Sequence, residues 1–380
     1  MMKICMLSSV HQCFDVRVFE KEAVSLAEAG HQVTVVAIAD FTEKMVGGIR
    51  LLGLPQPTTR ALRPLTWYGI LKIALRERAD IYHFHDPELL IVGLLLKALA
   101  QKPVIYDVHE NYPESILTKP WIPRLLRKTV SQLFRVFEDV MARFIDGVVV
   151  VNKLLADRFR GKSRVATVSN YARIERFGGQ GPGFRQGKAL SKPYFVYAGR
   201  ISDERGIHEC MQAVRRLDDE NVELICAGPV GHVSNQELST LLDGSHSSTL
   251  FKYLGLLPHA DIPPLLREAL AGLLCFQATP NYLLVTPNKL FEYMSAGIPV
   301  IASDFPFIRE VVLEADCGLL VHPHDVQEIA GAMNHLLHNP EDARRLGRNG
   351  LRAARERYNW QREEKKLLSL YDSLLGTASR

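Results

Sequence analysis

Cysteine is scarce in this chain of 380 residues, and none of its six cysteines forms a C-x-x-C pair. Neither a zinc ribbon nor a disulfide framework is therefore indicated, and we expect buried thiols in a reducing compartment. An excess of one charge is also missing, because 46 Lys and Arg stand against 42 Asp and Glu. The net charge of +4 gives no reason to expect a nucleic-acid partner.

The sequence also lacks a long apolar run. The longest, residues 89–100, contains Lys97 and is too short to cross a bilayer. The first ten residues lead directly into an expected strand, without the apolar segment and small-residue cleavage site of a signal peptide. No short internal repeat is apparent either. These absences predict a cytoplasmic globular protein.

What is present is a chain long enough for two domains, each with its own core. Short apolar strands alternate with amphipathic helices in two series, which predicts an α/β protein of two doubly wound, Rossmann-like domains. A glycine-rich stretch at 178–183 is the best linker candidate. We expect an N-terminal domain over residues 1–178, a C-terminal domain over 193–358 and a last helix over 359–380. Such sheets bind ligands at the carboxyl ends of their strands.

The most informative stretch covers residues 287–304 and reads P-N-K-L-F-E-Y-M-S-A-G-I-P-V-I-A-S-D. Pro287 suits the first position of a helix, and Gly297 suits the left-handed residue that follows one. Residues 300–302 then form a short buried strand. Free N–H groups at the start of such a helix favour an anion, especially phosphate. Glu292, one turn further in, can accept from two neighbouring hydroxyls, as a ribose presents them.

This stretch resembles the nucleotide-sugar site of the family 4 glycosyltransferases with the GT-B fold, and the resemblance covers nearly the whole chain. It implies two Rossmann-like domains facing a central cleft, and retention of the anomeric configuration of the sugar. It also implies that the last helix returns to the N-terminal domain. The family usually has a second glutamate eight residues before Glu292, where this chain has Leu284. The missing carboxylate is one that family members direct at the hydroxyls of the donor sugar.

A second motif, A-G-R-I-S-D-E-R-G at residues 198–206, follows the first strand of the second domain. It is similar to the family signature G-R-x-x-x-x-K-G, with Arg205 where lysine is usual. The resemblance assigns Arg200 and Arg205 to the diphosphate, on which negative charge develops as the sugar departs. Arginine keeps the charge but changes the hydrogen-bond geometry. The structural alternative is a solvated loop with a surface pair of Asp203 and Arg205.

In the first domain, residues 105–113 (I-Y-D-V-H-E-N-Y-P) end a strand, which places Asp107 and His109 on one face. The family has a histidine in this loop near the donor sugar. The resemblance therefore implies that His109 hydrogen-bonds the sugar and stabilises its positively charged ring. Glu110 is expected to shape the acceptor side. The alternative is a helix-capping loop with a satisfied histidine.

Residues 10–17, V-H-Q-C-F-D-V-R, follow the first strand and resemble a bacterial variant of the family that reads H-x-x-x-D-x-R. Asp15 can cap the helix that follows, which is a full structural explanation. Arg17 stands in the first turn of that helix, where a cation opposes the dipole. This unfavourable position suggests a use, either gripping an acidic acceptor or binding Asp15.

Two features bear on metal ions. His83 and His85 lie on one face of an expected strand with Asp86 nearby, which suits a metal, but a strand end beside the cleft explains them equally well. No D-x-D pair occurs in the chain, so the usual divalent-cation motif of the other major glycosyltransferase fold is missing. We expect no metal and no cofactor, with the phosphates met by the two arginines and helix N-termini.

The segment before the signature helix should bring its backbone amides close to the phosphates. With the start of that helix it supplies the substrate-binding candidates Leu284, Val285, Thr286, Asn288 and Lys289. The base pocket is expected to be lined by Tyr253, Leu254, Gly255 and Leu257. An ordinary strand end explains these last four residues at least as well.

Residues 119–144 form a basic amphipathic segment that begins near Trp121. Apolar residues recur there at helical spacing, with Arg and Lys among them: Leu126, Val130, Phe134, Phe137, Met141 and Phe144. Such a helix can rest on anionic lipid at a membrane surface. The explanation favoured by the sequence is a helix whose apolar stripe covers the sheet, since such helices need one.

These motifs predict a metal-independent hexosyltransferase that moves a sugar from a nucleoside-diphosphate sugar to a glycan or lipid-linked acceptor. Peripheral contact with the inner face of the plasma membrane would accompany a lipid-linked acceptor. Two alternatives stay open. One is a GT-B sugar-nucleotide 2-epimerase, which needs carboxylates to remove a proton from the sugar. The other is a catalytically inactive nucleotide-sugar-binding subunit of a glycan-assembly complex, which Leu284 and Arg205 would suit.

Overall fold

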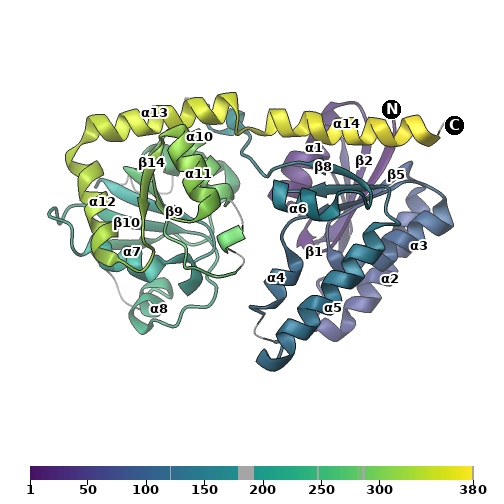
Figure 1. The fold of residues 1–380 in the computed structure, drawn as a ribbon, viewed down its shortest axis with the longest axis horizontal. Coiled ribbons are helices and arrows are strands. Elements are labelled where there is room, and N and C mark those ends of the chain that lie inside the picture. Colours follow the sequence, from purple (N-terminus) through teal and green to yellow (C-terminus); the bar gives the residue numbers. More distant parts are fainter. Residues whose placement is uncertain (120, 179–191, 246–247, 281, 285–286, 379–380) are drawn as a thin grey trace. The chain divides into compact units, whose positions relative to one another are not determined.

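The computed structural model describes residues 1–378, except 120, 179–191, 246–247, 281 and 285–286, and except the side chains of 284 and 375–378. The chain divides into two compact units (Figure 1). Unit 1 consists of Met1–Asn170 and Trp360–Arg380, and unit 2 of Tyr171–Asn359. Each unit is built around one β-sheet.

Unit 1 has an eight-stranded sheet in the order β3-β4-β2-β1-β5-β6-β7-β8, parallel throughout except for the β3–β4 pair. The strands are β1 (Lys3–Gln12), β2 (Gln32–Ile38), β3 (Glu43–Val46), β4 (Ile49–Leu54), β5 (Ile81–Phe84), β6 (Val104–Val108), β7 (Gly147–Val150) and β8 (Arg164–Thr167). β5 and β7 are buried at every position, as befits central parallel strands. β1 lies between β2 and β5, so the strand order reverses there and the carboxyl ends of β1, β5 and β6 are neighbours.

The β3–β4 hairpin was not predicted from the sequence. β3 is mostly exposed and begins with Glu43 and Lys44, so it lacks the apolar signal of the other strands. It joins the edge of the sheet through backbone pairing with β4.

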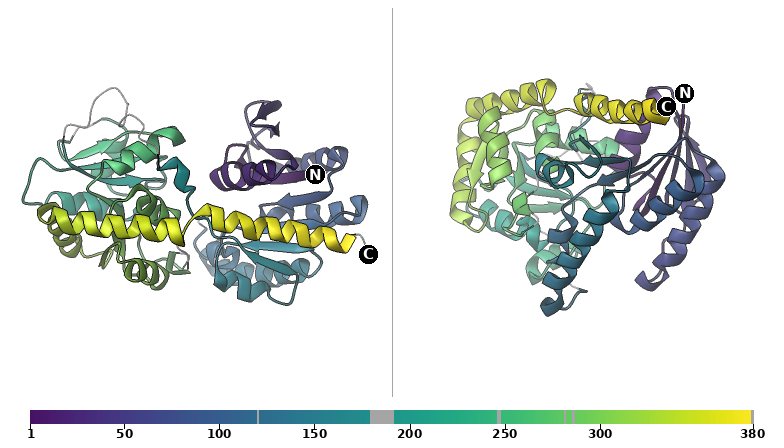
Figure 2. Two further views of the ribbon diagram at one scale, coloured as in Figure 1. Left: turned by 90° about the horizontal axis from the view of Figure 1, so that it is seen from above. Right: turned by 45° about the vertical axis from the view of Figure 1, so that its right-hand side comes forward.

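Helices cover both faces of this sheet. One core is formed with residues of α2, α3, α5 and α6, and the other with residues of η1, α1 and α14 (Figure 2). Their bounds are η1 (Val16–Ala23), α1 (Val24–Glu28), η2 (Arg60–Leu62), α2 (Arg63–Glu77), η3 (Pro87–Leu89), α3 (Leu90–Ala100), α4 (Tyr112–Ile116), α5 (Arg124–Ala142), α6 (Lys153–Phe159) and α14 (Trp360–Ala378). Trp360 at the start of α14 is buried and donates a hydrogen bond from Nε1 to Ser25 Oγ at 2.8 Å.

The first helix differs from the α-helix predicted over residues 16–29, because Val16–Ala23 is a π-helix. A π-helix bonds residues five apart, as the Glu20 N–H does with the Asp15 carbonyl at 3.3 Å. Residues five apart therefore share one face, and Arg17 and Glu22 meet on it.

Unit 2 has a six-stranded parallel sheet in the order β11-β10-β9-β12-β13-β14. The strands are β9 (Tyr194–Ala198), β10 (Glu223–Ala227), β11 (Phe251–Tyr253), β12 (Ala271–Leu274), β13 (Val300–Ser303) and β14 (Gly318–Val321). The helices are η4 (Ile174–Arg176), η5 (Asp203–Arg205), α7 (Ile207–Val214), α8 (Gln236–Leu242), η6 (His259–Asp261), α9 (Ile262–Arg267), η7 (Tyr282–Leu284), α10 (Asn288–Ala296), α11 (Pro306–Ala315), α12 (Val326–His338) and α13 (Pro340–Glu356). β9 lies between β10 and β12, so the strand order of unit 2 reverses at β9.

The signature stretch folds as the sequence predicts, with one shift. Pro287 is the N-cap of α10 and has extended backbone, so the helix begins one residue later than predicted. Gly297 ends the helix in the left-handed conformation with φ 75°, as expected. β13 then follows as a buried strand between β12 and β14.

The predicted state of the cysteines is confirmed, because all six are free and buried. No helix in the described part of the chain combines the length and the apolarity needed to span a membrane.

Candidate functional site

The carboxyl end of β9 in unit 2 is crossed by the side chain of Lys289 from α10. A Cβ atom at Gly199, the residue after β9, would lie 2.0 Å from Lys289 Nζ. Gly199 also has φ 154°, a conformation that L side chains rarely adopt. Any larger residue at position 199 would therefore expel the lysine from its place.

Lys289 forms no close ion pair with any described residue. Its Nζ lies 5.7 Å from the centroid of the Tyr197 ring, and no ion pair within 4.0 Å is found for it among the residues the structure describes. Burial lowers the pKa of Lys289, the charge of Glu292 raises it, and the charge of Arg205 lowers it further. Two positive side chains are thus close enough to repel each other.

Arg205, at the end of η5, is the second of these cations. Its guanidinium carbon lies 4.5 Å from the Phe276 ring centroid and 4.8 Å from that of Tyr282, which is cation–π geometry. Its Nε is buried and finds no hydrogen-bond partner within the described residues. The surface pair with Asp203 is not formed, because the Asp203 carboxylate accepts from the Ser234 N–H at 2.9 Å.

Arg200 and α10 complete this basic edge of the sheet. The Arg200 carbonyl accepts a hydrogen bond from the Tyr197 hydroxyl at 2.8 Å, and its side chain is exposed. The N-cap of α10 is Pro287, which offers no side-chain hydrogen bond to the first N–H groups of the helix. These N–H groups add a partial positive charge beside Lys289, the second residue of the helix. We name Arg200, Arg205 and Lys289 with the start of α10 the basic site.

The other predicted residues of unit 2 fall around the basic site or outside the described residues. Glu292 is half-buried in α10, close enough to affect the pKa of Lys289, and Asn288 is exposed at the first position of this helix. The Tyr253 hydroxyl donates to the Gly228 carbonyl at 2.8 Å, which explains its position structurally. Val285, Thr286 and the side chain of Leu284 lie outside the described residues.

In unit 1, the predicted residues gather around Asp107 at the end of β6. Arg17 donates to the two oxygens of Asp107 at 2.9 and 3.0 Å and to the Val168 carbonyl at 3.1 Å. The acidic partner of Arg17 is therefore Asp107, and not Asp15 as proposed from the sequence. Only 3% of the Arg17 side chain is exposed, so its contacts explain it as a buried ion pair.

Asp15 caps η1 as predicted. Its carboxylate accepts from the N–H groups of Arg17 and Val18 at 2.8 and 3.0 Å. His11 Nδ1 lies 3.1 Å from its other oxygen. Burial opposes ionisation, but the contact with His11 and the helix N–H groups lower the pKa of Asp15.

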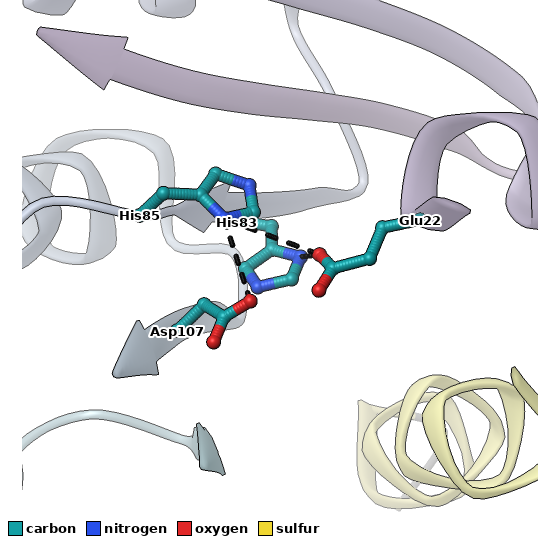
Figure 3. Close-up of side chains that lie close together, drawn as sticks. All are labelled: Glu22, His83, His85 and Asp107. Carbon is teal, nitrogen blue, oxygen red and sulfur yellow. Dashed lines mark ion pairs between the residues drawn. The ribbon is translucent and has the colours of Figure 1, made fainter. Parts of the chain in front are cut away.

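Four buried side chains of unit 1 bring potential metal ligands together: Glu22, His83, His85 and Asp107 (Figure 3). Their ligand atoms all lie within 4.8 Å of one another. This group differs from the one suggested by the sequence. Asp86 instead accepts from Ser8 Oγ at 2.8 Å and Ser9 N–H at 2.6 Å, and so holds the turn after β1.

The contacts of this group fit an ion-pair network better than a metal site. Arg17 Nε lies 2.9 Å from Asp107 Oδ2 and 3.0 Å from Glu22 Oε1. A divalent cation bound there would sit beside a buried guanidinium, which Coulomb repulsion disfavours. His83 Nδ1 is engaged by the Tyr371 hydroxyl at 2.8 Å.

His109 is the member of this network that reaches solvent, with 15% of its side chain exposed. Its Nε2 lies 3.6 Å from Asp107 Oδ2 and 3.2 Å from His85 Nδ1. Its ring is 4.7 Å from that of His11. Asp107 therefore orients His109, and Arg17 in turn holds Asp107. Glu110, the next residue, is half-buried.

Two family models match the sequence. One describes a glycosyl transferase 4-like domain and matches residues 16–170. The other describes glycosyl transferases group 1 and matches residues 184–353. The chain belongs to the GT-B glycosyltransferases of the family 4 type.

Related proteins and solved structures of other proteins match this glycosyltransferase over nearly the whole chain. A glycogen synthase of Mycobacterium tuberculosis is 22% identical over 89% of this chain and 86% of the relative. A phosphatidyl-myo-inositol mannosyltransferase of Mycobacterium leprae is 23% identical over 95% and 94%. The structure of sucrose-phosphate synthase from Thermosynechococcus elongatus matches with a TM-score of 0.78 at 18% identity, covering 99% of this chain and 100% of the other. HepE of Anabaena, solved with UDP-glucose, matches at 0.72 and 19%, covering 98% and 100%.

Sequence reasoning missed one central residue of this glycosyltransferase and underrated another. Glu22 was not considered, although a glutamate five residues after an arginine is visible in the sequence. Only the π-helix places these two residues on one face. Lys289 was placed among the substrate-binding candidates, and the structure puts its ammonium group at the end of β9, within electrostatic range of Arg205. No local pattern in the sequence predicts that the Lys289 side chain crosses the end of β9.

Proposed function

We propose that this glycosyltransferase takes its sugar from a nucleoside-diphosphate donor, whose diphosphate binds at the basic site of unit 2. The observation that carries this proposal is that Arg205 and Lys289 lie within electrostatic range of each other at one end of the unit 2 sheet. Two cations are held near each other without a carboxylate partner within 4.0 Å in the described residues. Holding like charges together costs free energy, which a bound dianion would offset.

The geometry of the basic site suits a leaving diphosphate. Breaking the bond between sugar and phosphate leaves negative charge on the phosphate oxygens. Cations that are fixed in place beforehand stabilise that charge in the transition state without reorganising. Tyr282, Phe276 and the tight turn at Gly206 hold Arg205, since a Cβ at Gly206 would lie 1.9 Å from the Cys275 carbonyl oxygen. No metal ion is required in this scheme.

Glu292 is proposed to bind the ribose of the donor. It lies one turn into α10, beyond the N–H groups that would face the phosphates. Its carboxylate can accept from both ribose hydroxyls. Tyr253 and its neighbours are proposed to line the base pocket.

The transfer is proposed to retain the anomeric configuration. In such a reaction the leaving phosphate oxygen takes the proton of the acceptor hydroxyl on the same face of the sugar. The protein then needs no nucleophile of its own, and its part is to position and neutralise charge. His109, held by Asp107, is proposed to hydrogen-bond the sugar.

The acceptor is proposed to be a glycan or a lipid-linked sugar. Named relatives include a glycogen synthase and a phosphatidyl-myo-inositol mannosyltransferase, and the structural relative HepE was solved with UDP and with UDP-glucose. These names support the class of substrate. A lipid-linked acceptor would bring the enzyme into peripheral contact with a membrane, and six buried free thiols support a reducing compartment such as the cytoplasm.

A thermal-shift screen of UDP-, GDP-, ADP- and TDP-sugars tests the donor class, because a ligand of the native state raises its melting temperature. We expect one base to give a clear shift that its free nucleoside diphosphate largely reproduces. The selected donor is then incubated with and without acceptors, and the anomer of the product is read by NMR. No shift with any donor would refute the proposal. An epimerised sugar nucleotide formed without acceptor would show the 2-epimerase instead.

A further inference from the structure

Helix α5 of unit 1 exposes much of its apolar surface. Of its 19 residues only Ser131, Glu138 and Ala142 are buried. Its predicted apolar stripe covers the sheet only in part: Phe137 and Met141 pack against the core, whereas Leu126, Val130 and Phe144 are exposed. The sequence-based preference for a core-facing helix is therefore wrong for the amino-terminal half of α5. In Figure 1 that half projects beyond the strands of unit 1.

The start of α2 joins the start of α5 in one exposed tip. The Arg60 guanidinium lies over the Trp121 ring, 4.3 Å from its centroid, and so ties η2 to the turn that precedes α5. Exposed apolar side chains follow from both elements. Leu125 is 94% exposed, Leu65 69% and Trp121 57%. We name as the α2–α5 tip the exposed apolar residues Leu62, Leu65, Trp121, Leu125, Leu126 and Val130.

Cations outnumber acidic residues around this tip, where Glu88 pairs with Arg63 at the start of α2. Residues 56–76 contain four Lys or Arg and no Asp or Glu, and residues 115–137 contain five Lys or Arg and no acidic residue. The chain as a whole is nearly balanced at 46 to 42, so the cations are concentrated here. Arg124 and Lys128, one turn apart on α5, are both exposed beside the leucines.

The combination of exposed apolar side chains and surrounding cations favours one binding partner of this tip over another. A second copy bound by two-fold symmetry would place the same basic residues opposite themselves, and like charges would repel. A bilayer interface with anionic headgroups satisfies both features, because leucine and tryptophan side chains enter the boundary of the acyl chains while Lys and Arg meet the phosphates. The tip also has the tryptophan that membrane interfaces favour.

We propose that the α2–α5 tip is a membrane-binding surface that inserts its leucines and Trp121 into an anionic lipid bilayer. The inference rests on the peripheral membrane contact of the proposed function, and it names the surface and the lipid chemistry. Each Lys or Arg near an anionic surface strengthens binding about fivefold. Binding is therefore expected to need anionic lipid and to weaken as salt is raised.

Co-sedimentation of the full chain with vesicles tests the proposal. Vesicles of phosphatidylcholine with phosphatidylglycerol should bind the protein, and vesicles of phosphatidylcholine alone should bind it much less. Arg124→Glu with Lys128→Glu should lower the partition coefficient by at least about tenfold. Leu125→Glu should lower it as well. Since these residues are exposed, the melting temperature should hardly change.

Matched controls come from unit 2. Arg344 and Arg348 are also exposed and one turn apart, on α13, and Leu313 is a 60% exposed leucine on α11. Changing the two arginines to Glu, or Leu313 to Glu, should leave vesicle binding within about twofold. Equal losses in test and control variants would overturn the proposal, as would equal binding to both kinds of vesicle.

Two further measurements separate this inference from its alternatives. Nucleotide binding by calorimetry should be unchanged in the tip variants, so that failure at the membrane is distinguished from failure of the donor site. Analytical ultracentrifugation of the free protein should show no self-association that Leu125→Glu abolishes. A dimer that this variant dissolves, with unchanged vesicle binding, would assign the tip to a second copy.

Discussion

Glu22 offers the sharpest test of how charge is distributed inside unit 1. It is fully buried, neither of its oxygens accepts a hydrogen bond from the described residues, and its contact with Arg17 is an ion pair at 3.0 Å. The single Nε–H of Arg17 donates to Asp107. One guanidinium thus faces two carboxyl groups.

Burial and the negative charge of Asp107 raise the pKa of Glu22 well above its usual range. Against the effect of burial, Arg17 holds the pKa of Asp107 well below its usual range. We therefore predict that Glu22 carries a proton at neutral pH.

Glu22→Gln replaces a protonated carboxyl group by a neutral amide of the same size. At pH 6 the free energy of unfolding should fall by no more than about 1 kcal/mol, since no charge is removed. Asp107→Asn is the contrasting variant, because it removes the carboxylate that neutralises the buried Arg17. That loss should be about 3–5 kcal/mol.

The free energy of unfolding should also depend on pH, in a direction that follows from the raised pKa of Glu22. A group whose pKa is raised by folding contributes fully to stability below its unfolded pKa, about 4.3 for glutamate. The contribution is lost as pH rises through the folded pKa, at about 1.4 kcal/mol per pH unit while Glu22 keeps its proton. The amide introduced by Glu22→Gln cannot titrate and escapes this loss. Between pH 5.5 and 7.5 the Glu22→Gln variant should therefore gain up to about 2.7 kcal/mol relative to the unchanged protein.

Urea unfolding followed by tryptophan fluorescence measures this difference in unit 1. The chain has three tryptophans, Trp67, Trp121 and Trp360, and all belong to that unit. A loss of several kcal/mol in Glu22→Gln at pH 6, with a gap to the unchanged protein that does not vary with pH, would refute a protonated Glu22. It would also favour a metal cation bound by Glu22, His83, His85 and Asp107.

Four further predictions concern the reaction. Arg205→Ala and Lys289→Ala should each cost about 2–4 kcal/mol of transition-state stabilisation, as should Arg200→Ala, and near-normal turnover in all three would exclude the diphosphate clamp. Glu292→Gln should weaken binding of the free nucleoside diphosphate by about 1.5–3 kcal/mol in calorimetry. Unchanged affinity would show that the Glu292 carboxylate does not bind the ribose. His109→Ala should depress kcat while leaving nucleotide affinity nearly unchanged, because the basic site belongs to the other unit; a matching loss of affinity would contradict that role. Activity should survive EDTA, and full loss that manganese or magnesium restores would place a metal in the mechanism.

Local features of the chain were predictable because adjacent residues fix them. Gly297 ends α10 and Asp15 caps η1 as the sequence predicts, and the apolar runs of β9 and β13 are strands. Each of these outcomes depends on backbone conformation and on hydrogen bonds within a few residues. The β3–β4 hairpin escaped prediction for the opposite reason. Its outer strand is mostly exposed and is defined by pairing rather than by an apolar pattern.

The sequence by itself thus determined the family, the alternation of strands and helices, and the motifs that carry Arg200, Arg205 and Glu292. The tertiary structure decided which charges meet. Arg17 pairs with Asp107, 90 positions away, because the order β1-β5-β6 brings the carboxyl ends of those strands together. Lys289 comes within electrostatic range of Arg205 because its side chain crosses the end of β9. Local sequence sets backbone geometry, but the pairing of distant charges depends on strand order, which no short stretch of residues specifies.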